Sequence, residues 1–202
     1  MTETEMQSIK ITADPKSQTT CHFTVDRPVY PDRSFYFGSK ERAKGSPLAE
    51  RLFEIPLVSS VLIAHDRVTV NKSDLDDWLP VARQVGAAIR AHLVTGLPAV
   101  SDDLHKSIPP QEELRSKVWE VLETRINPAV AAHGGFVQLI DVQGNTVYIQ
   151  MGGGCQGCGM ADVTLKQGVE VEIRAAVPEV GEILDTTDHA AGRNPYYTPS
   201  KK

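Results

Sequence analysis

Two cysteines separated by two residues are the part of this chain best suited to chemistry. Cys155 and Cys158 lie in the run MGGGCQGCG, residues 151–159, and five of the eight residues from Gly152 to Gly159 are glycine. A tight turn brings two thiols at this spacing to the same side, so that they can bind one metal centre together. Glycines permit positive φ angles and leave backbone N–H groups free to approach thiolates or cluster sulfides. We therefore take Cys155 and Cys158 as the candidate metal and cofactor ligands.

Two thiolates make only half of such a site, because an iron–sulfur cluster or a structural zinc ion takes four ligands. The third cysteine, Cys21, lies in the other half of the chain, and we expect it to be a packed thiol. A homodimer reaches four ligands, since two-fold symmetry brings Cys155 and Cys158 from each subunit to one axis. The sequence thus predicts a shared, all-thiolate site between two copies of the chain.

The same cysteine pair is compatible with other chemistry. A dithiol-disulfide oxidoreductase also places Cys-x-x-Cys at a helix N-terminus, but no repeated βαβ units are expected around it. A dimer with a structural four-thiolate zinc site has the same ligand pattern. Gly152, Gly154 and Gly157 match the dinucleotide fingerprint formally, yet we expect the preceding strand to belong to a hairpin and not to a parallel βαβ unit. Cluster, redox dithiol and zinc stay open on the residues alone.

Composition indicates a soluble globular protein of two small domains. The chain has 202 residues, 41% hydrophobic and 23% charged, with a formal charge of −5. The acidic excess lies in residues 96–202, which argues against nucleic acid as a partner. The acidic, polar N-terminus and three cysteines favour a reduced, cytoplasmic location. The charge-free run Val142–Ala161 is too rich in glycine and amides to be a membrane helix, so no membrane partner is expected.

The elements that must position the cysteines follow from local patterns in the second half. We predict a helix from Gln111 that is kinked at Pro128 and ends at Gly134-Gly135, a hairpin of Phe136–Val142 and Thr146–Met151, a helix from Met160 to Ala176, and a last strand within Glu179–Asp185. Residues 111–188 are therefore the expected domain that carries the cysteine pair, and residues 189–202 a tail.

The first half combines strands and helices in a second small domain, residues 1–95, joined by a linker over residues 96–110. We predict strands at Ser8–Thr12 and His22–Val25, a helix Pro47–Phe53 capped by Ser46, a hairpin of Leu57–Ala64 and Arg67–Asn71, and a helix from Ser73 to about His92 with Asp74, Asp76 and Asp77 in its first turn. Trp78 and Trp119 are expected in the cores. The predicted fold class is α+β, with each domain a short β-sheet packed with helices.

Several motifs resemble a known family. Ile126-Asn127-Pro128 through His133-Gly134-Gly135, the hairpin, Gly152–Cys158 and Val163–Glu170 look like the NifU C-terminal (Nfu-type) iron–sulfur carrier domain, over about residues 112 to 188. In the first half, Gly45–Ile55 and Val68–Asp74 with Trp78 resemble the Nfu N-terminal domain. Many members of the family place proline after the second cysteine, where this chain has Gly159, and an Asp-Gly-Gly-Asp-like segment where this chain reads His133-Gly134-Gly135-Phe136.

The resemblance implies a specific function. It implies a 4Fe-4S cluster, one per homodimer, bound through Cys155 and Cys158 of each subunit and delivered to apo iron–sulfur proteins. Its partners would be those client proteins and cluster-assembly proteins, with the N-terminal domain as the recognition module. No Ser/His/Asp set or carboxylate pair has a spacing that suggests catalysis, so we expect a carrier and not an enzyme.

Overall fold

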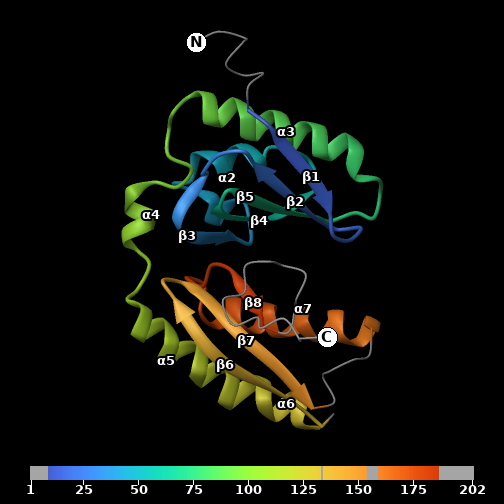
Figure 1. Ribbon diagram of the computed structural model, residues 1–202, viewed down its shortest axis with the longest axis vertical. Coiled ribbons are helices and arrows are strands. Elements are labelled where there is room, and N and C mark those ends of the chain that lie inside the picture. The colour runs from blue at the N-terminus through green and yellow to red at the C-terminus, as the bar shows by residue number, and fades with distance from the viewer. Residues whose placement is uncertain (1–8, 133, 154–158, 187–202) are drawn as a thin grey trace, which may run out of the picture. The chain divides into compact units, whose positions relative to one another are not determined.

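The computed structural model describes residues 9–132, 134–153 and 159–186. The chain forms two compact units, Met1–Ile108 and Pro109–Lys202, and each has its own β-sheet packed with helices (Figure 1). The predicted α+β fold class is confirmed. No helix among the described residues is long and apolar enough to cross a membrane.

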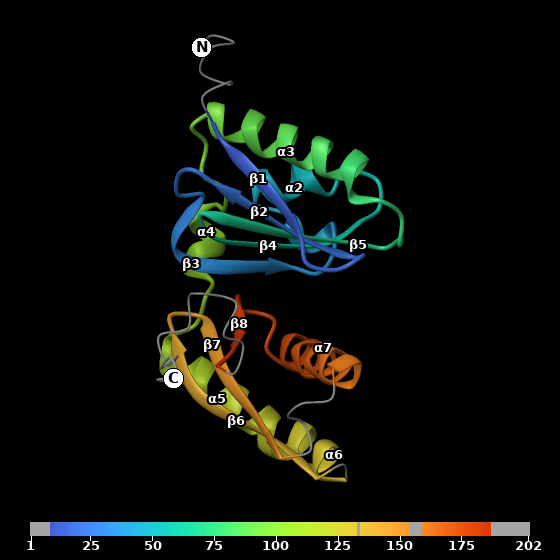
Figure 2. The ribbon, with the colours of Figure 1, turned by 45° about the vertical axis from the view of Figure 1, so that its right-hand side comes forward.

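The first unit is a five-stranded antiparallel sheet with helices on one face. Its elements are β1 (Ile11–Pro15), β2 (Thr20–Val25), β3 (Tyr30–Phe37), the short 3₁₀ turn η1 (Glu41–Ala43), α2 (Pro47–Leu52), β4 (Val58–His65), β5 (Arg67–Lys72), α3 (Trp78–Val94) and α4 (Asp102–Lys106). The strand order is β1-β2-β5-β4-β3, and α2 and α3 lie on the same face of the sheet (Figure 2).

Local patterns predicted part of this unit correctly. The hairpin of β4 and β5 turns at His65, whose φ of 53° is left-handed, and the Ser46 hydroxyl caps α2 by accepting from the Ala49 N–H. The prediction missed β3, because Pro31 reads as a strand breaker. The sheet tolerates this proline because β3 is an edge strand, where a missing N–H leaves no ladder bond unmade.

The predicted start of α3 at Ser73 is wrong. The helix begins at Trp78 with Asp77 as its N-cap, and the preceding residues wrap around the buried side chain of Lys72. Its Nζ donates to the Asp74 carboxylate at 2.5 Å and to the carbonyls of Asp74 and Asp76 at 3.0 and 2.7 Å. A buried ammonium needs such acceptors to offset its lost hydration, so these residues are held out of the helix.

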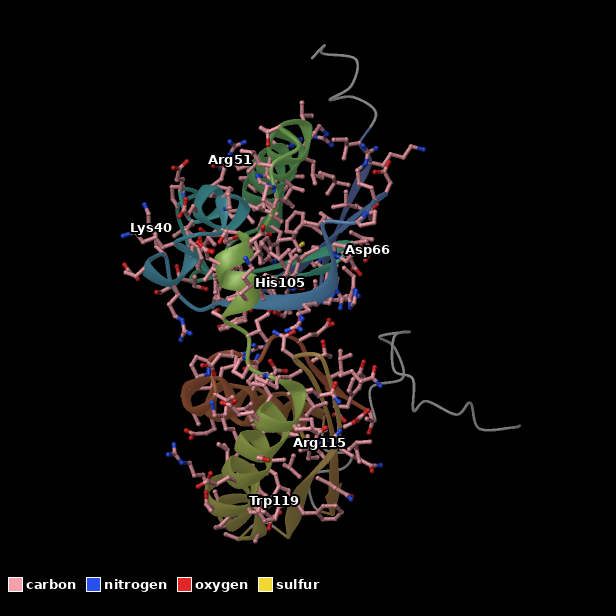
Figure 3. All side chains as sticks on the ribbon, turned by 90° about the vertical axis from the view of Figure 1, so that its left-hand side faces the viewer. Lys40, Arg51, Asp66, His105, Arg115 and Trp119 are labelled. Carbon is pink, nitrogen blue, oxygen red and sulfur yellow. The ribbon has the colours of Figure 1, made fainter. Side chains whose placement is uncertain are left out.

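The predicted linker over residues 96–110 is mostly part of the first unit. Ala99 and Val100 are buried in its core, and the Ser46 hydroxyl donates to the Ala99 carbonyl at 2.6 Å. The segment then forms α4, which carries His105 (Figure 3). Nδ1 of His105 lies 2.6 Å from the Tyr30 hydroxyl. A lack of hydrophobic period made this segment look like a linker, although Ala99, Val100 and Ile108 are buried.

The second unit is a three-stranded sheet flanked by helices. Its elements are α5 (Gln111–Val121), the π-helical turn η2 (Leu122–Ile126), α6 (Asn127–Ala131), β6 (Gly135–Gln143), β7 (Thr146–Gly153), α7 (Gly159–Ala176) and β8 (Ile183–Asp185). The strand order is β6-β7-β8. Figures 1 and 2 show α5 and α6 running alongside β6. The core contains these buried side chains: Leu114, Val118, Leu122, Val137, Ile149, Met151, Val169 and Ile173.

The predicted hairpin and C-terminal helix are confirmed, but the sheet has a feature that the sequence did not indicate. β7 pairs antiparallel with β6 and parallel with β8, in the register Val147↔Ile183. β7, α7 and β8 thus form one parallel βαβ unit, and the cysteine segment connects β7 to α7 in the chain. β7 belongs to a hairpin, as predicted, but the expectation that it does not also start a parallel βαβ unit was wrong. β8 lies within the predicted strand Glu179–Asp185, yet nothing in its three residues indicates which strand it pairs with.

The helix irregularity also differs from the prediction. The helix changes to a wider π-helical turn at η2, just before Pro128. There the Asn127 N–H donates to the carbonyl of Leu122, five residues earlier. A proline ring clashes with the carbonyl four residues earlier and cannot donate to it. A π turn removes that conflict while the chain stays helical through α6.

One buried histidine gives the first unit a pH dependence. His92 on α3 is buried, and its Nε2 has no hydrogen-bond partner within the described residues. Burial is the main reason that the pKa of His92 lies below its ordinary value of 6.5, and the positive charge of Arg51 lowers it further. The folded state therefore keeps this imidazole neutral under conditions where the unfolded chain takes up a proton.

We predict that the free energy of unfolding decreases as the pH falls below about 6.5, because protonation then favours the unfolded state. In His92→Gln the decrease over the same pH range should be smaller. Urea unfolding of the full chain at each pH measures this free energy. Both proteins carry Trp119→Phe, so that the fluorescence of Trp78 alone reports on the first unit. Equal pH slopes with and without His92 would contradict the prediction.

Candidate functional site

The cysteine pair lies between two described elements. Cys155 and Cys158 are outside the described residues, but β7 ends at Gly153 and α7 begins at Gly159, directly after Cys158. β6 fixes the end of β7 through the pairs Gly135↔Gly153 and Phe136↔Gly152. The connection that carries both thiols therefore starts from a paired strand end and finishes at the N-terminus of an 18-residue helix.

An aromatic ring lies against the strand end that leads to the cysteines. A Cβ added to Gly152 would stand 2.2 Å from Cζ of Phe136, which no real contact allows. Glycine at position 152 is thus what lets the Phe136 ring lie across β7. The ring itself is 50% exposed, so this contact forms part of the molecular surface beside the cysteine segment.

The side-chain amide of Asn127 binds the outer edge of β6 at Val137, the residue after Phe136. Its Oδ1 accepts from the Val137 N–H at 2.8 Å, and its Nδ2 donates to the Val137 carbonyl at 3.1 Å. The two bonds imitate the pairing that a neighbouring strand would supply. Nδ2 also lies 3.2 Å from the Glu123 carboxylate, so one side chain ties η2 and α6 to β6.

A second tie holds the far end of the same strand. The Arg115 guanidinium on α5 pairs with the Asp141 carboxylate, which also accepts from the Val142 N–H at 2.8 Å. Asp141 follows a register shift in the β6–β7 ladder, where backbone groups lack regular partners. Helix side chains thus fix β6 near both of its ends, and β6 in turn pairs with β7, the strand that leads to the cysteine segment.

The third cysteine is packed inside the first unit. Cys21 on β2 is fully buried in the core of that unit. Burial raises the pKa of its thiol to about 11, so the thiol stays protonated near neutral pH and is a poor nucleophile. This agrees with the expectation of a packed thiol. Within the described ranges, moreover, no three His, Cys, Asp or Glu residues group in a way that could hold a metal ion.

Other sequence expectations fare differently. Trp78 is buried as predicted, but Trp119 is 58% exposed, and its assignment to the core was wrong. His133 and the tail, residues 189–202, lie outside the described residues. The site residues that sequence reasoning missed are Asn127 and Phe136. A polar residue before Pro128 and an aromatic residue after two glycines were the available signals, but neither shows its partner.

We predict that Asn127→Ala lowers the free energy of unfolding by about 1–3 kcal/mol, because it leaves the Val137 N–H and carbonyl without partners. Hydrogen exchange at the Val137 amide should accelerate as well. The matched control is Gln138→Ala, a change at the exposed neighbour on β6, which should stay within about 0.5 kcal/mol of the parent. An unchanged exchange rate at Val137 in Asn127→Ala would contradict the role of the amide.

Two family models match the chain. Residues 9–96 match the one described as scaffold protein Nfu/NifU N terminal. Residues 118–184 match the one described as the NifU-like domain. The first match lies within the first unit of the fold and the second within the second unit.

Known proteins match as well. The Fe/S biogenesis protein NfuA of Stutzerimonas stutzeri (strain A1501) is 53% identical over 85 residues, which cover 42% of this chain and 44% of that protein. NfuA of Acinetobacter baylyi is 40% identical over 95 residues, covering 45% of each. The chain spans about half the length of the curated relatives it matches. A NifU-like protein from Saccharomyces cerevisiae, solved in solution, covers 50% of this chain with a TM-score of 0.43 and 20% identity. Residues 9–96 thus belong to the Nfu/NifU N-terminal family, and residues 118–184 belong to the NifU-like domain family.

Proposed function

We propose that this protein is an iron–sulfur cluster carrier. The observation that carries the proposal is the Cys-x-x-Cys pair inside a segment that matches the NifU-like domain. The relatives are themselves named Fe/S biogenesis proteins. The cluster is the cargo of such a protein, which binds it, shields it and passes it on without a catalytic step of its own.

The proposed cargo is one 4Fe-4S cluster held between two subunits. Each iron of such a cluster takes one thiolate from protein, so four thiolates are needed. Cys155 and Cys158 supply two per chain, and a two-fold dimer supplies the rest. The N-terminus of α7, which follows Cys158 directly, supports this proposal, because the positive end of a helix dipole favours thiolates over thiols.

Delivery to an apo-protein proceeds by ligand exchange. A client thiol loses its proton and binds an iron, and the departing thiolate of Cys155 or Cys158 takes up a proton. Each iron keeps its ligand count, no electron is transferred, and the cluster keeps its charge. After four such exchanges the cluster belongs to the client, and the two subunits lose the group that joined them.

The first unit would act as the module that recognises clients or assembly proteins. Its buried Cys21 has a raised pKa, and its described residues hold no metal-binding group. A unit whose described residues offer no cluster ligands would contribute to delivery by choosing where the cluster goes. This division supports the proposed separation of recognition in residues 1–95 from cluster binding in residues 111–188.

We predict about two irons and two sulfides per chain after anaerobic reconstitution, because two chains share one cluster. The mass in solution should double on loading. Cys155→Ser and Cys158→Ser should each lose the cluster while the apo fold, measured by circular dichroism, is unchanged. Cys21→Ala is the matched control, since it also removes a thiol but should keep the full iron content.

The same experiment separates the remaining alternatives. A colourless dimer with zinc and no iron would replace the carrier with a structural zinc site. A monomer without metal that reduces a model disulfide would favour a dithiol oxidoreductase. Normal iron content in either Cys155→Ser or Cys158→Ser would overturn the ligand assignment itself.

A further inference from the structure

A groove of about 330 Å³ runs between the helical segment α5–η2 and the edge strand β6. Trp119, Leu122 and Glu123 line it from the helical side, and Phe136 and Leu139 line it from the strand. Asn127 and Val137, which two hydrogen bonds join, also line it. These bonds fix the separation of helix and strand, so the groove is a built feature and not a gap between mobile side chains.

Two large aromatic side chains stand at the groove with much of their surface in solvent. Trp119 is 58% exposed and Phe136 is 50% exposed. Figure 3 shows Trp119 one helical turn beyond Arg115 on α5. Exposed aromatic rings on opposite sides of a concavity are typical of surfaces that receive a side chain of a partner.

The groove also carries a negative charge. The Glu123 carboxylate lines it and accepts one hydrogen bond, from Asn127 at 3.2 Å. No cation pairs with Glu123 within the part of the chain that the structure describes, whereas nearby Arg115 and Lys117 on α5 are paired with Asp141 and Glu113. A carboxylate beside two aromatic rings is complementary to a planar cation, which stacks on a ring and donates to the carboxylate.

From this combination we propose that the groove binds an arginine side chain of a partner protein. The guanidinium lies between Trp119 and Phe136 and donates to Glu123, and the aliphatic stem packs on Leu122 and Leu139. Lysine is a poorer fit, because a compact ammonium cannot stack on a ring and form a planar pair at once.

The groove lies beside the strand end that leads to the cysteine segment. Phe136 pairs with Gly152, and its ring lies on that glycine, so a partner seated in the groove is held beside the strand end that leads to Cys155. If the proposed carrier function holds, the partner is the protein that gives or receives the cluster. The arginine site itself does not depend on a cluster and is tested without one.

The test uses the full chain with both Cys155 and Cys158 changed to serine and labelled with ¹⁵N. The probe is the peptide acetyl-Gly-Ala-Arg-Ala-Gly-amide. We expect saturable shifts at the Trp119 indole N–H and at the amides of Phe136 to Leu139. The same peptide with citrulline, a neutral isostere of arginine, should bind at least about fivefold more weakly.

Two variants with the same charge change sharpen the test. Glu123→Gln should weaken the arginine peptide by about fivefold. Glu120→Gln is the matched control, because Glu120 lies three residues before Glu123 in the segment α5–η2, is exposed and does not line the groove. Trp119→Leu should also weaken binding while resonances outside the groove keep their positions, which shows that the fold is intact.

Each remaining outcome overturns the proposal. No saturable shift at the groove, or equal binding of the arginine and citrulline peptides, would exclude an arginine site. Equal effects of Glu123→Gln and Glu120→Gln would show that the peptide is held by general electrostatic attraction and not by the carboxylate in the groove. If the same resonances shift when the protein is concentrated without peptide and the mass doubles, the occupant is a second copy of this chain. Because the cysteines are absent, none of these results bears on cluster binding.

Discussion

The second unit depends on how the side-chain amide of Asn127 completes the open edge of β6. An edge strand exposes N–H and carbonyl groups that must find partners, and here one amide serves both groups of Val137. That contact fixes the strand against the helices, and the strand in turn pairs with β7 up to Gly153. The cysteine connection therefore starts from a backbone position that is set by a residue more than 25 positions earlier in the chain.

The parts of the fold that sequence predicted well are those that local periodicity determines. The hairpin of β6 and β7 follows from alternating apolar residues around Gly144, and α7 follows from Leu165, Val169 and Ile173 at helical spacing. Trp119 shows the limit of this reasoning. It lies next to Val118 in sequence but about 100° further round the helix, at the border of the buried face, where pattern alone does not decide between core and surface.

Other features depend on partners that are distant in sequence or too short to form a pattern. In sequence, Asp74 and Asp76 read as residues of a first helical turn, although the buried Lys72 ammonium holds their backbone out of α3. Asn127 reads as a helix residue before proline, and only the folded chain brings it to Val137. For the candidate site, the two thiols were predicted from their spacing, whereas the surface beside them came from tertiary packing alone.

The parallel pairing of β7 with β8 has a consequence for how the protein is made. Val147 pairs with Ile183, so the strand that completes the sheet is among the last described residues of the chain. During synthesis Cys155 and Cys158 leave the ribosome well before β8 does. The crossover that contains them can close only when residues 183–185 have been added, and a parallel pairing of this separation forms more slowly than the local hairpin of β6 and β7. The finished frame around the cysteines is thus a product of the complete unit and not of the growing chain.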